Sequence, residues 1–131
     1  MVLDHIYNRC YMRGSTDSES PMRTNWFHIL LCLADGEQHG YGIMQEVLER
    51  TCGKVRLWPA TLYGALRTLL EEGLILECEE RPAVEANDAR RRYYRLSERG
   101  REALSAEIMR LESLLQTARA KRRGLNREVA L

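Results

Sequence analysis

The sequence lacks the patterns that mark several large classes of protein. Its four cysteines, at positions 10, 32, 52 and 78, form no CxxC pair, and no segment approaches the roughly eighteen consecutive apolar residues of a membrane-spanning helix. The first residues also lack the basic start and apolar run of a secretory signal. We therefore expect reduced thiols, no membrane partner and a cytoplasmic location.

Catalytic and nucleotide-binding motifs are missing as well. There is no G-x-S-x-G and no P-loop. The glycines at 40 and 42 are not a dinucleotide fingerprint, because position 45 is Gln instead of the third glycine. The three histidines, at 5, 28 and 39, fall in an expected tail, a buried helix and a loop. We predict that the protein is not an enzyme and needs no cofactor.

Charges are balanced in number but unevenly placed. The 131 residues carry a formal net charge of +1, so the total gives no strong electrostatic signal. Six arginines nevertheless crowd into one short stretch: Arg90, Arg91, Arg92, Arg95, Arg99 and Arg101. A near-neutral chain with such a local basic stripe can still bind a polyanion.

The length suits one ordinary domain with a tail at either end. We expect a disordered N-terminal extension over residues 1–22, because "GSTDSES" is a run of small polar residues. One hypothesis is that Met22 is the biological start. The folded domain is expected over 23–96, a C-terminal helix over 97–123 and a frayed tail over 124–131.

Hydrophobic spacing predicts three short helices in succession. The first covers residues 23–34 and is apolar on most sides, which indicates burial. The second begins at Gly40 or Gly42 and ends at Gly53. The third, residues 59–72, has Pro at its first position and Gly73 just past its end.

After the third helix, apolar and polar residues alternate with a period of two. Residues 74–80 and 90–96 alternate as strands do, and a polar connector over 81–89 is expected to form the mobile tip of a two-stranded wing. Ser97 is a suitable N-cap for the final helix. Gly100, inside its first turn, indicates close approach of another backbone.

The third helix carries an unusual outer face. Its leucines fall on one side, and the other side offers small, hydroxyl-bearing and cationic residues in place of the usual Glu and Lys: Ala60, Thr61, Tyr63, Gly64 and Arg67. Small residues allow close approach, hydroxyls donate to phosphates or base edges, and arginine reaches guanine or phosphate. In a winged helix-turn-helix the third helix enters the major groove, so this face is predicted to bind DNA.

The final helix has an apolar seam with spacings of four and three. Leu104, Ile108, Leu111 and Leu115 lie on it, as in a coiled coil. A helix this long protrudes beyond so small a core, so the seam is predicted to be covered by a second copy of the chain. The fold class is mainly α: a winged helix-turn-helix of three helices and a two-stranded β wing, with a long C-terminal dimerisation helix.

Three segments carry a family resemblance. "HILLCLADGEQHGYGIMQEV", "PATLYGALRTLLEEGLI" and "RRRYYRLSERGREAL" resemble the PadR family of bacterial transcriptional regulators, over about residues 23–118. The resemblance implies a homodimer joined through the C-terminal helix with help from the first helix. It also implies a palindromic DNA operator, usually repression, and often release by a small-molecule effector.

The resemblance also assigns roles to individual positions. Thr61 and Tyr63 match the DNA-facing positions of the recognition helix, Tyr41 matches a tyrosine near the DNA backbone, and the base of the wing is matched by Arg90, Arg91 and Arg92. Trp58 departs from the family, which has a small or polar residue there. It is expected either to lie against a sugar–phosphate backbone or to pack on the wing.

The effector mode seen in some drug-sensing members needs a tryptophan on the C-terminal helix. Residues 97–131 contain no aromatic residue, so that mode does not apply. Trp26 and Phe27 of the first helix are the aromatics left for a pocket at the dimer interface.

Two alternatives can be compared with the regulator hypothesis. His28 and Cys32 lie four residues apart, as two metal ligands on a helix do, but their apolar surroundings favour core packing, and we predict no metal site. The second alternative is a winged-helix module that binds protein without binding DNA of its own. The net charge of +1 and a solvent-facing Trp58 support it.

Overall fold

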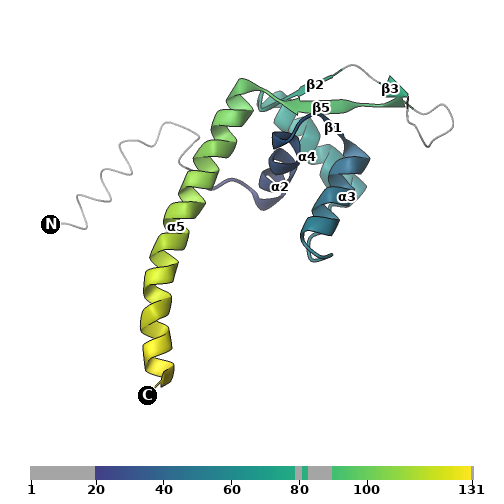
Figure 1. Ribbon diagram of the computed structural model, residues 1–131. Coiled ribbons are helices and arrows are strands. Elements are labelled where there is room, and N and C mark those ends of the chain that lie inside the picture. Colours follow the sequence, from purple (N-terminus) through teal and green to yellow (C-terminus); the bar gives the residue numbers. More distant parts are fainter. Residues whose placement is uncertain (1–19, 79–80, 83–89, 131) are drawn as a thin grey trace. The chain divides into compact units, whose positions relative to one another are not determined.

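The computed structural model describes the backbone of residues 20–78, 81–82 and 90–130 (Figure 1). Residues 22–104 form one compact unit, and the remainder of the last helix, from Ser105, belongs to a second. The elements, in chain order, are α2 (Thr24–Ala34), β1 (Gln38–His39), α3 (Gly40–Arg50), α4 (Pro59–Glu71), β2 (Ile75–Glu77), β3 (Arg81–Pro82), β4 (Arg90–Arg91), β5 (Tyr93–Leu96) and α5 (Glu98–Ala130).

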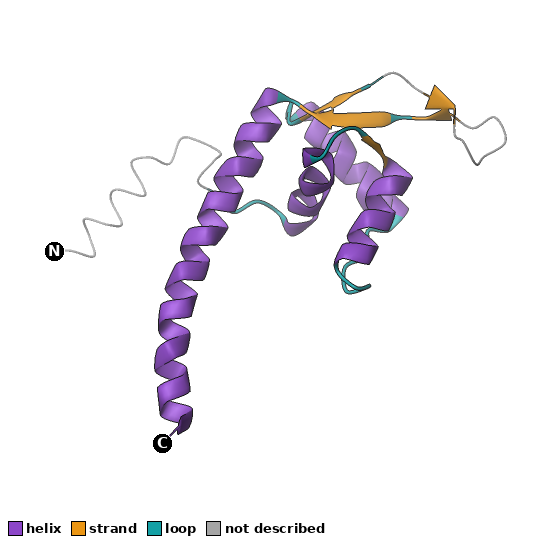
Figure 2. Ribbon diagram, in the orientation of Figure 1, coloured by secondary structure: helices purple, strands orange, loops and turns teal. Residues whose placement is uncertain are grey.

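The three helices α2, α3 and α4 pack on one another, and α2 and α4 also contact the strands (Figure 2). Their shared core is almost entirely aliphatic. Its most deeply buried side chains are Ile29, Leu30, Leu33, Ile43, Val47, Leu62, Leu66, Leu69 and Ile75. Each leucine or isoleucine removed from water in this way contributes roughly 2 kcal/mol, so the core fixes how each helix is turned about its own axis.

Helix α4 begins and ends where its sequence predicts. Pro59 is the first helical residue, with Trp58 as N-cap. Just beyond the C-cap, Gly73 has a φ of +75°, the left-handed conformation that ends many helices. Leu62, Leu66 and Leu69 are buried, so the leucine stripe faces inward.

The sheet differs from the expected two-stranded wing. It has three strands in the order β1-β5-β2, with β1 and β2 both antiparallel to β5. Gln38 pairs with Tyr94 and His39 with Tyr93, so residues expected to form a loop supply the third strand. Two residues are too few to show the alternation of apolar and polar side chains that marks a strand in a sequence. Gln38 and His39 form a strand only because they pair with β5.

The hairpin continues outward as a separate two-stranded sheet. Arg81 of β3 pairs with Arg91 of β4, and Pro82 pairs with Arg90. The expected connector over residues 81–89 therefore begins in a strand, and residues 83–89 lie outside the described part of the chain.

The start of α5 is bound to the turn after α4. Ser97 caps the helix by accepting a hydrogen bond from the Gly100 amide at 2.9 Å, and its hydroxyl donates to the Gly73 carbonyl at 2.6 Å. A Cβ on Gly100 would overlap the carbonyl oxygen of Leu74. The close backbone approach predicted at Gly100 is confirmed.

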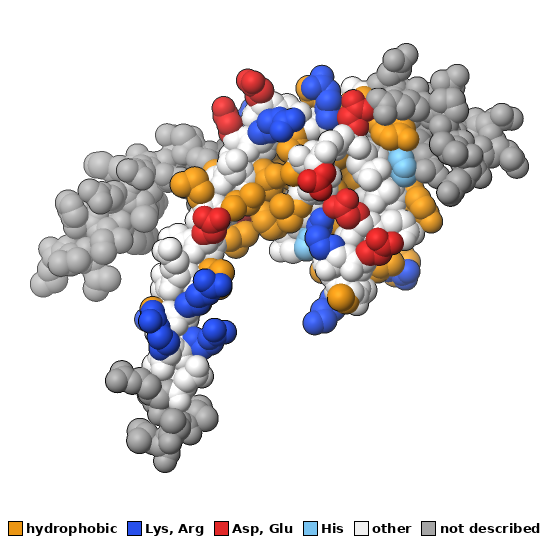
Figure 3. Space-filling view, viewed as in Figure 1, with side chains coloured by type: hydrophobic (Ala, Val, Ile, Leu, Met, Phe, Trp, Pro, Cys, Tyr) orange, Lys and Arg blue, Asp and Glu red, His pale blue; other side chains and the backbone are white. Residues whose placement is uncertain are grey.

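Helix α5 is longer than predicted. It runs for 33 residues, or about 50 Å at 1.5 Å per residue, and passes through the region 124–130 that was expected to be a frayed tail. A single glycine, Gly124, costs a helix only about 1 kcal/mol, which does not stop it here. Basic side chains gather over its later turns (Figure 3). Within the described segments, none of the helices combines the length and the apolar composition that a membrane span requires.

Replacing Gly100 by Ala is expected to lower the free energy of unfolding by about 2 kcal/mol, because the new methyl group meets backbone that cannot move without strain. Gly64→Ala is the matched control. Gly64 is also helical, and nothing lies within 4 Å of its added Cβ, so the free energy of unfolding should rise by up to about 1 kcal/mol. Denaturant unfolding measures both, and equal effects of the two substitutions would contradict the contact.

Candidate nucleic-acid interface

The outward face of α4 carries the residues predicted to meet DNA. Ala60, Thr61, Gly64 and Arg67 are exposed, and Tyr63 is 49% exposed. All five lie opposite the buried leucines. The structure therefore leaves this face open within the chain, as the leucine spacing predicted.

Tyr63 is oriented by the start of α3. A Cβ added to Gly40 would lie 2.8 Å from the Tyr63 hydroxyl oxygen and 3.1 Å from two of its ring carbons. The tyrosine ring thus rests on the bare backbone of Gly40. This contact explains why the turn before α3 needs a glycine there, and it brings the outer face of α4 next to the first turn of α3.

Tyr41 lies in that same first turn and is 50% exposed. The preceding residue, His39, caps α3, since its Nδ1 accepts a hydrogen bond from the Gly42 amide at 2.9 Å. The His39 ring stacks with Tyr41, with 6.5 Å between centroids, and meets the edge of Tyr93 at 5.2 Å. Tyr41 is thereby tied to the sheet through His39.

Of the three arginines at the base of the wing, the structure describes the side chain of Arg92. Arg90 and Arg91 form β4, and their side chains lie outside the described part of the structure. Arg92 is exposed, with its Nε 3.4 Å from Oε1 of Glu77. An ion pair this exposed is worth little in water, so Arg92 can exchange Glu77 for a phosphate at small cost.

Trp58 is largely open to solvent. It is 60% exposed, and the guanidinium of Arg56 lies 4.7 Å from the centroid of its ring. Arg56 was absent from the residues predicted for the site. The signal that could have found it is the alternation of polar and apolar residues in "KVRLW", residues 54–58.

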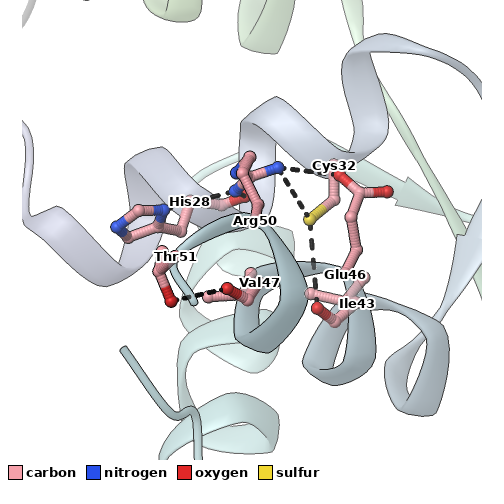
Figure 4. A network of polar contacts seen from close by, with 7 residues as sticks. All are labelled: His28, Cys32, Ile43, Glu46, Val47, Arg50 and Thr51. Carbon is pink, nitrogen blue, oxygen red and sulfur yellow. Dashed lines mark hydrogen bonds and ion pairs between the residues drawn. The ribbon is translucent and has the colours of Figure 1, made fainter. Parts of the chain in front are cut away.

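His28 and Cys32, whose spacing suits two metal ligands on a helix, both contact Arg50 (Figure 4). Arg50, at the end of α3, donates to the Cys32 sulfur at 3.7 Å and approaches the His28 Nδ1 at 3.2 Å. It also forms an ion pair with Glu46 at 2.7 Å. A cation between the two would-be ligands opposes metal binding, and the described residues contain no cluster of three or more ligand side chains.

This arginine network holds α3 against α2. Burial, with smaller effects of Glu46, raises the pKa of the Cys32 thiol to about 12, so the thiol stays protonated and unreactive. Burial, and next the charge of Arg50, lower the pKa of His28 below 6.5. His28 therefore stays neutral at pH 7.

The predicted dimerisation residues fall into two groups. Leu104 is buried in the core of residues 22–104, and the half-buried Trp26 packs against that core under the guanidinium of Arg23, 5.3 Å from its ring centroid. In the second unit, Leu111 is 37% and Leu115 48% exposed, and Ile108 is exposed as well. The exposed part of the seam therefore begins at Ile108.

The fold and this face together define a class. Three helices, a hairpin wing placed after the third helix, and an exposed face on that helix make a winged helix-turn-helix protein. A family model of PadR-like transcriptional regulators matches residues 29–106. The chain belongs to this PadR-like family of transcriptional regulators.

Solved structures agree with the assignment. A PadR family transcription regulator from Clostridium difficile is 22% identical, with a TM-score of 0.64 over 75% of this chain and 97% of that one; at this identity the likeness concerns the fold alone. Bacillus subtilis PadR, solved in complex with operator DNA, is 25% identical, with a TM-score of 0.53 over 63% of this chain and 46% of that one.

One curated relative is closer in sequence. An uncharacterised 37.1 kDa protein in transposon Tn4556 of Streptomyces fradiae is 42% identical over 88 residues. The match covers 66% of this chain but only 23% of that relative. The chain thus spans about a quarter of the relative's length.

The network around Arg50 makes stability depend on pH through His28. Its pKa is lower in the folded chain than the unfolded value of 6.5, so its contribution is complete above pH 6.5 and is lost as the pH falls through the folded pKa. His28→Gln keeps an acceptor for Arg50 and does not titrate. We expect the melting temperature of the variant to fall less between pH 7.5 and 5 than that of the native chain. An equal fall of the melting temperature in the variant and the native chain would exclude a role for His28 in the pH dependence of stability.

Proposed function

We propose that this chain is a sequence-specific DNA-binding repressor that binds a palindromic operator as a homodimer and responds to a small-molecule effector. The exposed face of α4 carries the proposal. Thr61, Tyr63 and Arg67 are open to solvent while the leucines of the same helix are buried. The Bacillus subtilis relative solved on operator DNA supports it.

In this proposal α4 enters the major groove and the neighbouring elements hold the phosphates. Thr61 and Tyr63 donate to base edges or phosphate oxygens, and Arg67 reaches guanine or phosphate. Ala60 and Gly64 allow close approach, which agrees with the open space over Gly64. Tyr41 and the arginines at 90–92 contact phosphates on either side of the groove.

The homodimer is proposed from the exposed seam of α5. Ile108, Leu111 and Leu115 expose apolar surface at coiled-coil spacing, and a second copy of the same seam is its natural cover. Trp26 of α2 is proposed to assist. A two-fold dimer reads half-sites about 34 Å apart, one turn of the duplex.

Effector control is proposed to act on the separation of the two recognition helices. A ligand weakens DNA binding only by its differential affinity for a dimer with another separation. Trp26 and Phe27, both half-buried, are the aromatic residues proposed to line a ligand site at the dimer interface. Such a regulator works on the chromosome, which places it in the cytoplasm.

The 60% exposure of Trp58 favours a second candidate, a winged-helix adaptor that binds another protein. Mobility shifts on the DNA upstream of the gene, at two salt concentrations, separate the two. A specific complex that weakens steeply with salt supports the repressor. Retention of a protein partner without any DNA complex supports the adaptor.

Replacing Tyr63 or Arg67 by Ala should reduce specific DNA affinity about 10-fold to 100-fold, since each removes a contact worth roughly 1–3 kcal/mol of discrimination. Light scattering should show an unchanged oligomer, because both side chains are exposed and lie outside the core. Arg119→Ala, which removes an exposed cation from α5 outside the arginine-rich stretch 90–101, is the control for Arg67→Ala and should retain affinity. Loss of the oligomer together with DNA binding would show that this face is part of an interface between copies.

Leu111→Glu should convert the dimer to monomers in light scattering, because it places a charge in the apolar seam. Met109→Glu is the matched control, since Met109 is 68% exposed but lies off the seam. Its dimer should persist. A dimer that survives Leu111→Glu would contradict the seam.

A further inference from the structure

The five residues before α4 form a segment with an inner and an outer side. Val55 packs on the core and Leu57 is buried, whereas Lys54, Arg56 and Trp58 are exposed. Thr51 fixes the start of the segment, because its hydroxyl accepts from the Val55 amide at 3.0 Å and donates to the Val47 carbonyl of α3 at 2.8 Å. The outer side therefore presents two cations and an indole from a backbone held at both ends.

Charge around this segment has one sign. Residues 51–70 contain three cations, Lys54, Arg56 and Arg67, and no Asp or Glu. The chain as a whole has 20 basic and 19 acidic residues, so a stretch of this length without an acid stands out. It runs through most of α4, and the segment is therefore continuous in sequence and in charge with the proposed DNA face.

Arg56 and Trp58 are arranged to meet an anion. The guanidinium carbon of Arg56 lies over the Trp58 indole, 4.7 Å from its centroid, within the range of a cation–π contact. A guanidinium is planar and carries five N–H donors in its plane. That plane matches the geometry of two phosphate oxygens. The stack also holds the arginine in place before binding, so less side-chain entropy is lost when a phosphate is bound.

We propose that Lys54, Arg56 and Trp58 form a second DNA contact, a clamp on the sugar–phosphate backbone beside the groove entered by α4. The clamp rests on the proposed function, and it adds residues outside the face of α4. Arg56 and Lys54 pair with phosphates, and the indole lies along the deoxyribose. The contact is independent of base sequence, since every nucleotide presents the same backbone.

The test uses the full chain and two duplexes: one that the native protein selects from a random-sequence pool, and one of unrelated sequence. Arg56→Ala and Trp58→Ala should each weaken binding to both duplexes by a similar factor, about 5-fold to 20-fold, and Arg56→Ala should reduce the salt slope by about one unit. Tyr63→Ala should lower affinity mainly for the selected duplex. Arg119→Ala, which removes the same charge from an exposed position of α5 outside the arginine-rich stretch 90–101, should leave the affinity for both duplexes unchanged.

Fluorescence gives a direct reading of Trp58. The chain has two tryptophans, so Trp26→Phe leaves Trp58 as the sole tryptophan, which can be excited selectively at wavelengths that the tyrosines do not absorb. Its emission should be quenched when either duplex is added. Trp58→Phe keeps an aromatic ring and should retain most of the affinity that Trp58→Ala loses, with unchanged melting temperatures showing that both variants are folded.

The outcomes separate the clamp from the proposed function. Native binding to a selected duplex, with unchanged affinity and salt slope in Arg56→Ala and Trp58→Ala, overturns the clamp and leaves the repressor intact. An equal loss in Arg119→Ala also overturns it, because the effect would then be one of total charge. Failure of the native chain to select any duplex overturns both proposals. Loss of a protein partner in Trp58→Ala, with DNA binding unchanged, assigns the surface to that partner.

Discussion

The rotation of α4 about its own axis is the constraint on which the proposed interface depends. Leu62, Leu66 and Leu69 are buried in the core, and turning the helix to hide any other face would return them to water at roughly 2 kcal/mol each. With those leucines inside, Tyr63 lies over Gly40 and Arg67 is open to solvent. The same burial holds the N-cap of α4, and with it the segment that carries Arg56, beside the proposed DNA face.

Helix α3 is held at both ends, by the three-stranded sheet at its start and by α2 at its end. At its start, His39 pairs with Tyr93 as part of the sheet and caps the helix through its ring nitrogen. At its end, Arg50 binds the backbone carbonyl of His28 at 3.2 Å. Tyr41 is therefore carried on a helix whose two ends are fixed to different elements. A phosphate contact from a helix of this kind loses little conformational freedom on binding.

Near-neutral net charge is compatible with DNA binding when the charges are segregated. The acid-free stretch from residue 51 to residue 70 lies on the proposed interface. The acidic residues that balance it fall elsewhere, such as the exposed Glu49 on α3 and the exposed Glu71 at the end of α4. Attraction to a polyanion acts over about one Debye length, near 10 Å at moderate salt. The local charge of the surface that approaches DNA therefore governs the attraction, and the net charge of the chain is a poor guide to it.

The amino-acid sequence by itself determined the three helices, the ends of α4 at Pro59 and Gly73, the exposed face of α4 and the close backbone approach at Gly100. Each of these features follows from the local spacing of apolar residues or from the conformation of a single residue. The tertiary structure alone decided that Gln38 and His39 form a strand and that Arg56 lies over the ring of Trp58. A two-residue strand has no period of its own, and it exists only through β5, which lies more than fifty residues later. The contact between Arg56 and Trp58 depends on the direction of the backbone that carries them. Core packing sets that direction, and it brings together residues that lie far apart in the sequence.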